Sequence, residues 1–232
     1  MVFSYGKIVD LRFKNNLMLW HIVQLCNPAK TGNPNFHLWC SNVSVLVVKP
    51  TLTFFGGRQT LLVRNKLVTT LSVLRRQFQI SFDFKPTKWI GGWTNVLHLT
   101  TGPNCCAPGS RIPGIFTLGG KLAMSFGIDK NGNHVIWTPK LALNRWVHFT
   151  ISQTLEGKRY IYRVYMNNKL LEKRLNHIPR DYKNVKVFVA DNWYNAQPGF
   201  IKNIRITSKQ LGVTGEFLVF LKHDISKLVY AI

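Results

Sequence analysis

Strict alternation of apolar and polar side chains is the feature that most constrains the fold of this chain. Over residues 78–84 the sequence reads FQISFDF, so four apolar side chains alternate with three polar ones. Because successive side chains of a strand point to opposite faces, the segment predicts a strand with one buried face. Roughly ten short segments of this kind, separated by turns, predict an all-β antiparallel sandwich or barrel.

The expected strands lie between residues 67 and 207. Their ranges are 67–74, 78–84, 96–101, 115–118, 122–128, 134–138, 146–152, 160–166, 169–175, 185–189 and 200–207. Turns are expected at 119–120, 129–133 and 167–168, where Gly, Asn and Asp are concentrated. We expect one domain over 60–208, because the extensions 1–59 and 209–232 show no sustained period.

The charge balance favours polyanions as partners. The 232 residues include 31 Lys and Arg against 9 Asp and Glu, a formal net charge of +22. Such a charge predicts attraction to glycosaminoglycans, nucleic acids or anionic membrane surfaces. A hydrophobic content of 46% argues against disorder, and the apolar runs are too short for a membrane-spanning helix. The first residues do not have the pattern of a signal peptide.

Several motifs, taken in order, resemble a known superfamily. They are FQISFDF at 78–84, GKL at 120–122, NRWVHFTIS at 144–152, MNNK at 166–169 and ADNWYNAQPGFIKNIRI at 190–206. Over about 60–208 they resemble the concanavalin A-like lectin/glucanase superfamily and, within it, the laminin G-like domains. The resemblance implies a jelly-roll sandwich of two curved antiparallel sheets. It also implies an extracellular binding module for glycans or proteins, often with calcium.

The glucanase activity of that superfamily is not expected here. Glycoside hydrolysis needs two suitably placed carboxyl groups. This chain has three glutamates, Glu156, Glu172 and Glu216, and no Glu-x-Asp-x-Glu strand. We therefore expect no enzyme activity and no catalytic residue, and turnover of a β-glucan would contradict this prediction.

The basic segment 158–186 is the first candidate binding site, with nine basic residues and two acids. A two-residue turn at 167–168 would place Met166 opposite Lys169 and Arg163 opposite Glu172, with three arginines on one face. Arginine binds sulfate and carboxylate through two parallel hydrogen bonds. We predict that an anionic glycan such as heparan sulfate binds Arg159, Arg163, Arg174, Lys183 and Lys186. The alternative is a solvated face whose charges only maintain solubility.

Trp193 and Tyr194 are the second candidate, because amide and carboxylate residues flank them. Such aromatic side chains can stack on a sugar ring while their polar neighbours bind its hydroxyl groups. The alternative is a loop folded over one edge of the sandwich, with Trp193 buried.

No cofactor or metal site is expected. Residues 129–133 have the alternating oxygen ligands that begin a calcium loop, but position 12 of that loop is Lys140. A hairpin turn is favoured there, and calcium stays the alternative. Cys105 and Cys106 lie in an irregular loop, where they can pair with each other or elsewhere, and Cys26 with Cys40 is a second candidate pair.

These observations predict a non-catalytic, extracellular, lectin-like module whose partner is an anionic glycan. Protein–protein adhesion through its loops is the alternative. Specific nucleic-acid binding is not expected, because the chain shows no recognition motif for it.

Overall fold

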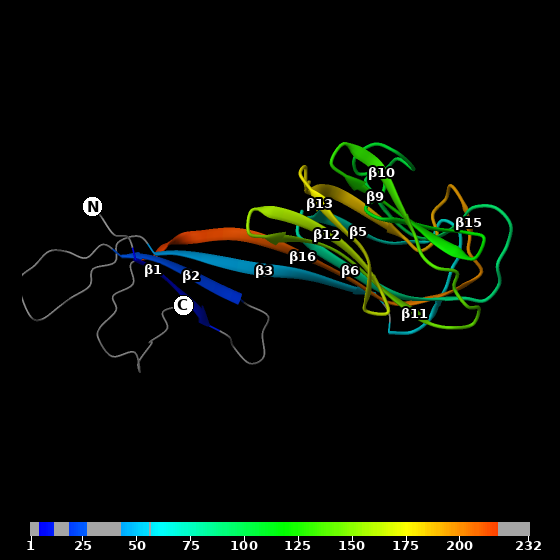
Figure 1. Ribbon diagram of the computed structural model, residues 1–232, viewed down its shortest axis with the longest axis horizontal. Coiled ribbons are helices and arrows are strands. Elements are labelled where there is room, and N and C mark those ends of the chain that lie inside the picture. Colours follow the sequence, from blue (N-terminus) through cyan, green and yellow to red (C-terminus); the bar gives the residue numbers. More distant parts are fainter. Residues whose placement is uncertain (1–4, 12–18, 27–42, 56, 218–232) are drawn as a thin grey trace, which may run out of the picture. The chain divides into compact units, whose positions relative to one another are not determined.

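The fold is all-β, as the alternation predicts. The computed structural model describes residues 5–11, 19–26, 43–55 and 57–217, with side chains at 53 and 57–208. Every regular element in these ranges is a strand (Figure 1). Within the same ranges, no helix is long and apolar enough to cross a membrane.

The chain forms two compact units, one of residues 51–209 and one of 1–50 with 210–232. In the second of these, β1 (Tyr5–Leu11) pairs with β2 (Leu19–Cys26), and β2 pairs with β3 (Val43–Phe55), both in antiparallel order. The domain boundaries at 59 and 208 stay predictions.

The unit 51–209 contains two sheets. The neighbouring strands of sheet I are, in order, β16 (Gly199–Phe217), β6 (Phe78–Pro86), β11 (Val147–Glu156), β12 (Arg159–Met166) and β13 (Lys169–Asn176), and β4 (Thr60–Leu61) pairs with β16. Sheet II has the order β10 (Asn131–Trp137), β9 (Lys121–Ile128), β8 (Gly114–Leu118), β7 (Thr94–Thr100), β14 (Tyr182–Phe188) and β5 (Leu67–Leu74). The two-residue β15 (Asn195–Ala196) joins β7 in parallel, whereas the other described pairs of sheet II are antiparallel.

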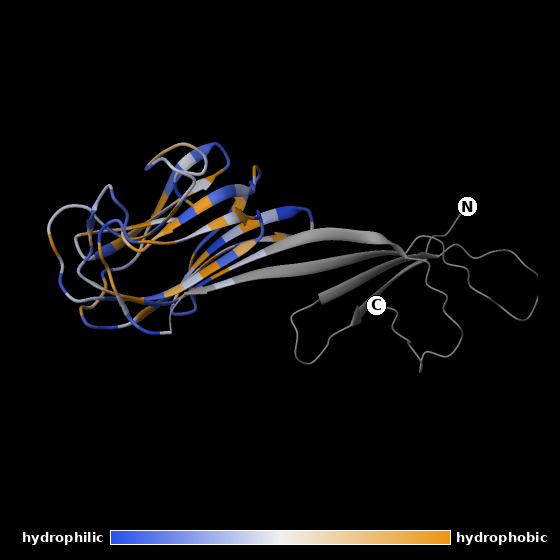
Figure 2. Ribbon diagram, turned by 180° about the vertical axis from the view of Figure 1, so that it is seen from behind, coloured by the Kyte–Doolittle hydropathy of each residue, from blue (hydrophilic) through white to orange (hydrophobic). Residues whose placement is uncertain are grey.

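The core lies between the two sheets and is built by the alternating residues. Ile80, Phe82 and Phe84 of β6 are completely buried, and the Phe82 ring stacks on that of Phe149 in β11 at 5.4 Å. Sheet II contributes Leu99 and Met124, among others, to the same apolar cluster. Figure 2 shows the result as hydrophobic and hydrophilic residues alternating along the strands. Burying each large apolar side chain stabilises the fold by about 1.5–3 kcal/mol.

The bounds of several predicted strands are corrected, and β16, for example, continues to Phe217 instead of ending at residue 207. β10 begins at Asn131, inside the segment expected as a turn, so the turn before it is tighter than predicted. β11 continues to Glu156 instead of ending at residue 152, because every residue of β12 pairs with β11, as far as Arg159 opposite Glu156.

The register of the β12–β13 hairpin is the most consequential correction. Met166 lies opposite Lys169 as predicted, but Arg163 lies opposite Lys173, so its predicted pairing with Glu172 is wrong. A register shift after Val164 causes this, because it leaves one extra residue in β13. A shift of one residue moves side chains to the opposite face.

Candidate functional site

A groove of about 440 Å³ lies on the face of sheet I that is turned away from the core. It crosses the three neighbouring strands β6, β11 and β16. We call it the polar groove, and its lining residues are Gln79, Ser81, Asp83, His148, Thr150, Asn203, Arg205 and Thr207. Each lining residue is polar or charged, so the groove suits a ligand rich in hydroxyl groups.

A bulge in β16 brings two consecutive side chains to this face. The pairing of β16 with β6 shifts between Lys202 and Arg205, and Asn203 has a left-handed φ of 53°. Ile201 and Ile204 on either side are both buried in the core. Lys202 and Asn203 between them therefore lie on the outer face together, which regular alternation would not allow.

The Asp83 carboxylate organises the polar groove. One oxygen lies 2.6 Å from His148 Nδ1 in β11, and the other accepts a 2.6 Å hydrogen bond from Asn203 Nδ2 in β16. His148 Nε2 lies 3.2 Å from Thr150 Oγ1, and the His148 side chain is 41% exposed. Because Asp83 fixes side chains of both neighbouring strands, the groove is ordered before any ligand arrives.

Two lysines extend the groove along the same face. Lys85 Nζ lies 4.9 Å and Lys202 Nζ 4.3 Å from the centroid of the Trp146 ring, and Lys85 Nζ also lies 5.0 Å from that of Phe200. Lys85 is two residues beyond Asp83, and Lys202 is the cross-strand partner of Asp83. We call Lys85 and Lys202 the lysine pair. The aromatic rings hold these ammonium groups without neutralising them.

The six acids of the segment 57–208 are all engaged by arginine or histidine. The pairs are Asp83 with His148, Asp129 with His177, Glu156 with Arg163, Glu172 with Arg174, Asp181 with Arg75 and Arg76, and Asp191 with His98. No lysine of that segment lies within 4.0 Å of a carboxylate. The lysine pair therefore has no carboxylate partner among the described residues.

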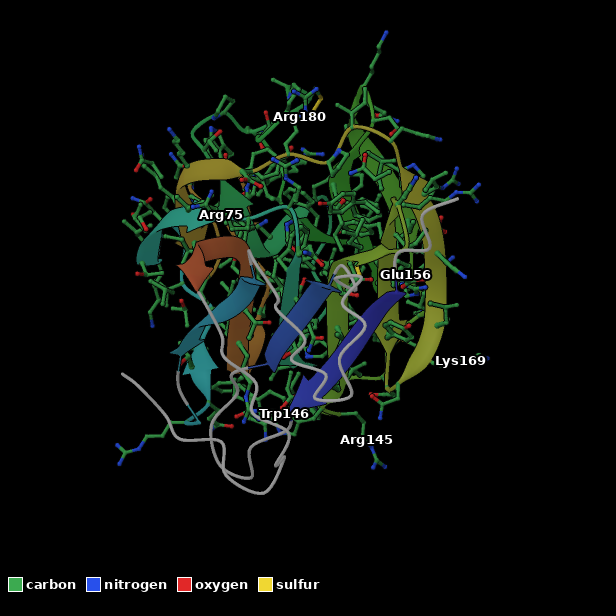
Figure 3. The ribbon with its side chains drawn as sticks, turned by 90° about the vertical axis from the view of Figure 1, so that its left-hand side faces the viewer. Arg75, Arg145, Trp146, Glu156, Lys169 and Arg180 are labelled. Atoms are coloured by element: carbon green, nitrogen blue, oxygen red, sulfur yellow. A yellow bond between two sulfur atoms is a disulfide. The ribbon has the colours of Figure 1, made fainter. Side chains whose placement is uncertain are left out.

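Two of the three predicted hairpin arginines, Arg163 and Arg174, are ion-paired, and these two lie on different faces. Arg163 binds Glu156 through two hydrogen bonds, and that contact raises the pKa of Arg163 and lowers the pKa of Glu156. Arg174 lies opposite Tyr162, and its Nε donates to Glu172 Oε1 at 2.9 Å. In Figure 3, Glu156 and Lys169 lie at one side of the molecule, apart from Trp146, which marks the end of the polar groove.

The other predicted cations lie on two sheets. Arg159, the first residue of β12, is exposed in sheet I. Lys183 and Lys186 are exposed in β14 of sheet II. The structure therefore does not gather the five predicted cations into one face, and their role in binding stays a prediction.

Trp193 and Tyr194 belong to an aromatic cluster on sheet II. Trp193 is 37% exposed, and its ring lies 5.4 Å from that of His98, while the Tyr194 ring lies 5.0 Å from that of Phe116. Asp191 Oδ1 accepts the backbone N–H groups of both residues at 3.1 and 3.0 Å. The loop is therefore fixed, and the alternative of a buried Trp193 is not what the structure shows.

Residues 129–130 form a turn that anchors a neighbouring loop. Asp129 accepts the backbone N–H groups of His177 and Ile178 at 2.5 and 3.2 Å. Desolvation opposes ionisation of Asp129, but the hydrogen bonds from His177 outweigh it and lower its pKa. A Cβ on Gly132 would lie 2.3 Å from the Cys106 carbonyl oxygen, so close packing explains this glycine. No group of three or more His, Cys, Asp or Glu suited to a metal occurs in the described part of the chain.

Cys105 and Cys106 form a disulfide between adjacent residues. This is one of the two arrangements that the sequence left open. The proposed pairing of Cys26 with Cys40 involves residue 40, which lies outside the described residues.

Sequence reasoning missed the polar groove, although part of its signal was visible. Gln79, Ser81 and Asp83 alternate with core residues in β6, and His148 and Thr150 do so in β11. The pattern could not show that β6, β11 and β16 are neighbours in one sheet, because these strands lie far apart in the chain.

Comparisons with known proteins give weak likenesses. No family model and no curated protein sequence matches the chain. Among solved structures, the binding domain of botulinum neurotoxin serotype G has 14% identity and a TM-score of 0.45, over 76% of this chain and 46% of that one. The Ruminococcus gnavus IT-sialidase CBM40 bound to α2,3-sialyllactose has 12% identity and a TM-score of 0.40, over 69% of this chain and 95% of that one. Sheep galectin-11 in complex with glycerol has 15% identity and a TM-score of 0.34, over 66% and 96%.

The chain spans less than half the length of the neurotoxin domain. With TM-scores below 0.5, these likenesses carry no conclusion about its ligand.

Proposed function

We propose that this chain is a non-catalytic glycan-binding module that holds an anionic saccharide in the polar groove. The observation that carries the proposal is the lysine pair at the end of an ordered, hydroxyl-binding groove. Hydroxyl groups of the sugar bind Thr150, Asn203 and Arg205, and its sulfate or carboxylate group lies at Lys85 and Lys202.

The electrostatics support an anionic ligand. Lys85 and Lys202 have no carboxylate within ion-pair distance among the described residues, so an incoming anion does not have to displace a protein carboxylate. The net charge of +22 adds long-range attraction, to which the exposed Arg159, Lys183 and Lys186 contribute. We keep the hairpin cations and Trp193–Tyr194 as secondary parts of the proposal.

The absence of enzyme activity is also part of the proposal. Each acid of the segment 57–208 is engaged by a histidine or arginine, and the groove contains a single carboxylate, Asp83. Hydrolysis of a glycosidic bond uses two carboxyl groups that flank it. Calcium is not needed for this mode of binding, and the extracellular location that the family resemblance implies is part of the same proposal.

A glycan array on the full chain, run with calcium and with chelator, tests the proposal. We expect binding to sulfated or carboxylated glycans under both conditions, and loss of that binding in the variant His148→Ala with Asn203→Ala. Gln59→Ala, at an exposed residue outside the groove, is the control for a general effect of surface changes. No binding to any acidic glycan, or unchanged binding by the double variant, would refute the proposal.

A further inference from the structure

Three tryptophans on the outer face of sheet II are exposed, which is unusual for so large an apolar side chain. Trp93 is 44% exposed, Trp137 46% and Trp193 37%. The Trp93 and Trp137 rings lie 5.6 Å apart and are tilted by 43°. We call Trp93 and Trp137 the tryptophan platform. Trp93 lies directly before β7 and Trp137 at the end of β10, and β8 and β9 lie between these two strands in sheet II.

Core packing does not explain why a tryptophan occupies position 137. Phe116, Ala123 and Trp137 are cross-strand partners in β8, β9 and β10, so they form one row. Ile115 and Leu122, the residues directly before Phe116 and Ala123, face the core, so this row lies on the outer face of the sheet. Phe116 and Ala123 are buried, but nearly half of Trp137 stays exposed.

The support beneath the platform is rigid. Thr94, which follows Trp93, donates a 2.8 Å hydrogen bond to Gln197 Oε1, and Thr117 of β8 donates to the same oxygen at 2.7 Å. Gln197 Nε2 in turn donates to the Lys88 carbonyl oxygen at 2.6 Å. The Trp93 ring contacts the buried Phe116 ring edge-on at 6.4 Å. The protein therefore loses little conformational entropy when a ligand stacks on these rings.

The charges near the platform favour an uncharged ligand. Arg111 lies 4.6 Å over the Phe116 ring, and it already donates to Asn104 O at 3.1 Å and to Asn133 Oδ1 at 2.5 Å. Desolvation by burial lowers the pKa of Arg111. The His98–Asp191 pair beneath the same cluster is completely buried. Among the described residues, Arg111, His98 and Asp191 all have hydrogen-bond partners, in contrast to the lysine pair on sheet I, which has no carboxylate partner.

The turn directly before Trp93 is uncrowded. A Cβ on Gly91 or Gly92, the two residues before Trp93, would meet no atom within 4 Å. Gly92 also has a left-handed φ of +77°, so a larger residue there would strain the turn. A flat ligand can therefore reach the indole faces without moving a side chain of this turn.

We infer that the tryptophan platform is a second binding site, which takes an uncharged, chain-like saccharide by stacking of pyranose rings on Trp93 and Trp137. The C–H-rich face of a pyranose matches an indole face in size and polarity, and no charge needs a partner. The tilt between the rings suits a chain that turns from one sugar to the next. A single-stranded nucleic acid also stacks on aromatic rings, but it requires cations along its backbone. The site is independent of the polar groove, because it lies on the other sheet.

Electrophoresis of the full chain in gels that contain a neutral polysaccharide tests this inference. The probes are hydroxyethyl cellulose, xylan, galactomannan and laminarin, with heparin and oligo-dT as polyanion probes. We expect retardation by at least one neutral polysaccharide, resistant to high salt, because stacking does not depend on charge. In Trp93→Ala with Trp137→Ala the affinity should fall by about tenfold or more. Trp93→Phe with Trp137→Phe should keep part of it, since flat rings remain.

Two controls separate this site from the polar groove. Leu170→Ala removes an exposed apolar side chain from β13 and should leave retardation unchanged. Lys85→Ala with Lys202→Ala should weaken heparin binding and leave the neutral polysaccharide unaffected. The inference is wrong if no neutral polysaccharide retards the protein. It is also wrong if both tryptophan variants bind as the natural chain does, or if only heparin or oligo-dT binds through these tryptophans.

Discussion

The end of the polar groove and the β12–β13 hairpin both carry basic side chains, but only the two arginines of the hairpin are ion-paired with acids. In the hairpin region, Arg163 binds Glu156 and Arg174 binds Glu172. At the groove, Lys85 and Lys202 contact the Trp146 ring and no carboxylate. The local density of positive charge alone favours the hairpin as the anion-binding site. The contacts of the individual cations favour the groove instead. We therefore expect a cation to contribute to anion binding only where no carboxylate of the protein is already paired with it.

The comparison predicts that paired charges act on stability and that unpaired charges act on binding.

The completely buried contact between His98 and Asp191 is the extreme case of a carboxylate with a partner. His98 Nδ1 lies 2.7 Å from Asp191 Oδ2, and Nε2 lies 2.7 Å from the Ser110 carbonyl oxygen. Asp191→Ala should reduce the free energy of unfolding by about 3–5 kcal/mol, because it leaves His98 buried without its partner. Chemical denaturation measures this, with Asn192→Ala as control. A loss below about 1 kcal/mol, within the range of exposed pairs, would contradict the expected role of the pair.

Removal of the lysine pair should have the largest effect on anion binding. Lys85→Ala with Lys202→Ala should weaken binding to heparin about tenfold and shift elution from a heparin column to lower salt. Stability should change little, because neither lysine has a carboxylate partner among the described residues. Elution at the salt concentration of the natural chain would place the anion elsewhere.

Asp181 should make stability depend on acid pH without affecting binding. Desolvation opposes its ionisation, but hydrogen bonds from the backbone N–H and side chain of Arg76 and from Arg75 lower its pKa below the usual 3.8. A lowered pKa in the folded state stabilises the protein above about pH 4 and ceases to do so as the pH falls through the folded-state value.

Asp181→Asn should therefore cost about 1–2 kcal/mol at neutral pH, and the difference from the natural chain should shrink below about pH 4. Thermal unfolding across this pH range measures the effect, and heparin elution should stay the same. A difference that does not change with pH would show that the hydrogen bonds, rather than the charge of Asp181, are responsible.

The hairpin arginines should have the smallest effect on binding. Arg163→Ala with Arg174→Ala removes the same two positive charges as the lysine variant, so it is matched to it in net charge. Heparin affinity should fall by less than about twofold, because the partners Glu156 and Glu172 already occupy these guanidinium groups. A loss equal to that of the lysine variant would restore the hairpin as the main site.

The sequence was sufficient to predict the sandwich because its information is local. The alternation in β6 requires only that neighbouring side chains point to opposite faces, and Asn167–Asn168 formed the expected turn, with positive φ at both residues. The pairing of Trp193 and Tyr194 with polar neighbours was also visible locally. Those features needed no knowledge of which strands are adjacent.

The polar groove and the tryptophan platform could not be predicted, because distant residues and bulges create them. Asp83, His148 and Asn203 meet only after β6 takes its place between β11 and β16. The Asn203 bulge turns a regular strand into one with two consecutive outward residues, and the hairpin bulge moves Arg174 away from the face of Arg163. Bulges depend on long-range packing as much as on local sequence.

The most direct test is to follow backbone amide chemical shifts of the full chain during titration with a heparin tetrasaccharide. Binding in the polar groove predicts the largest changes along 79–85, 147–150 and 202–207, the segments of β6, β11 and β16 that form it. Changes concentrated along 159–175, with the groove segments unaffected, would contradict the claim that the unpaired lysines, and not the paired arginines, hold the anion.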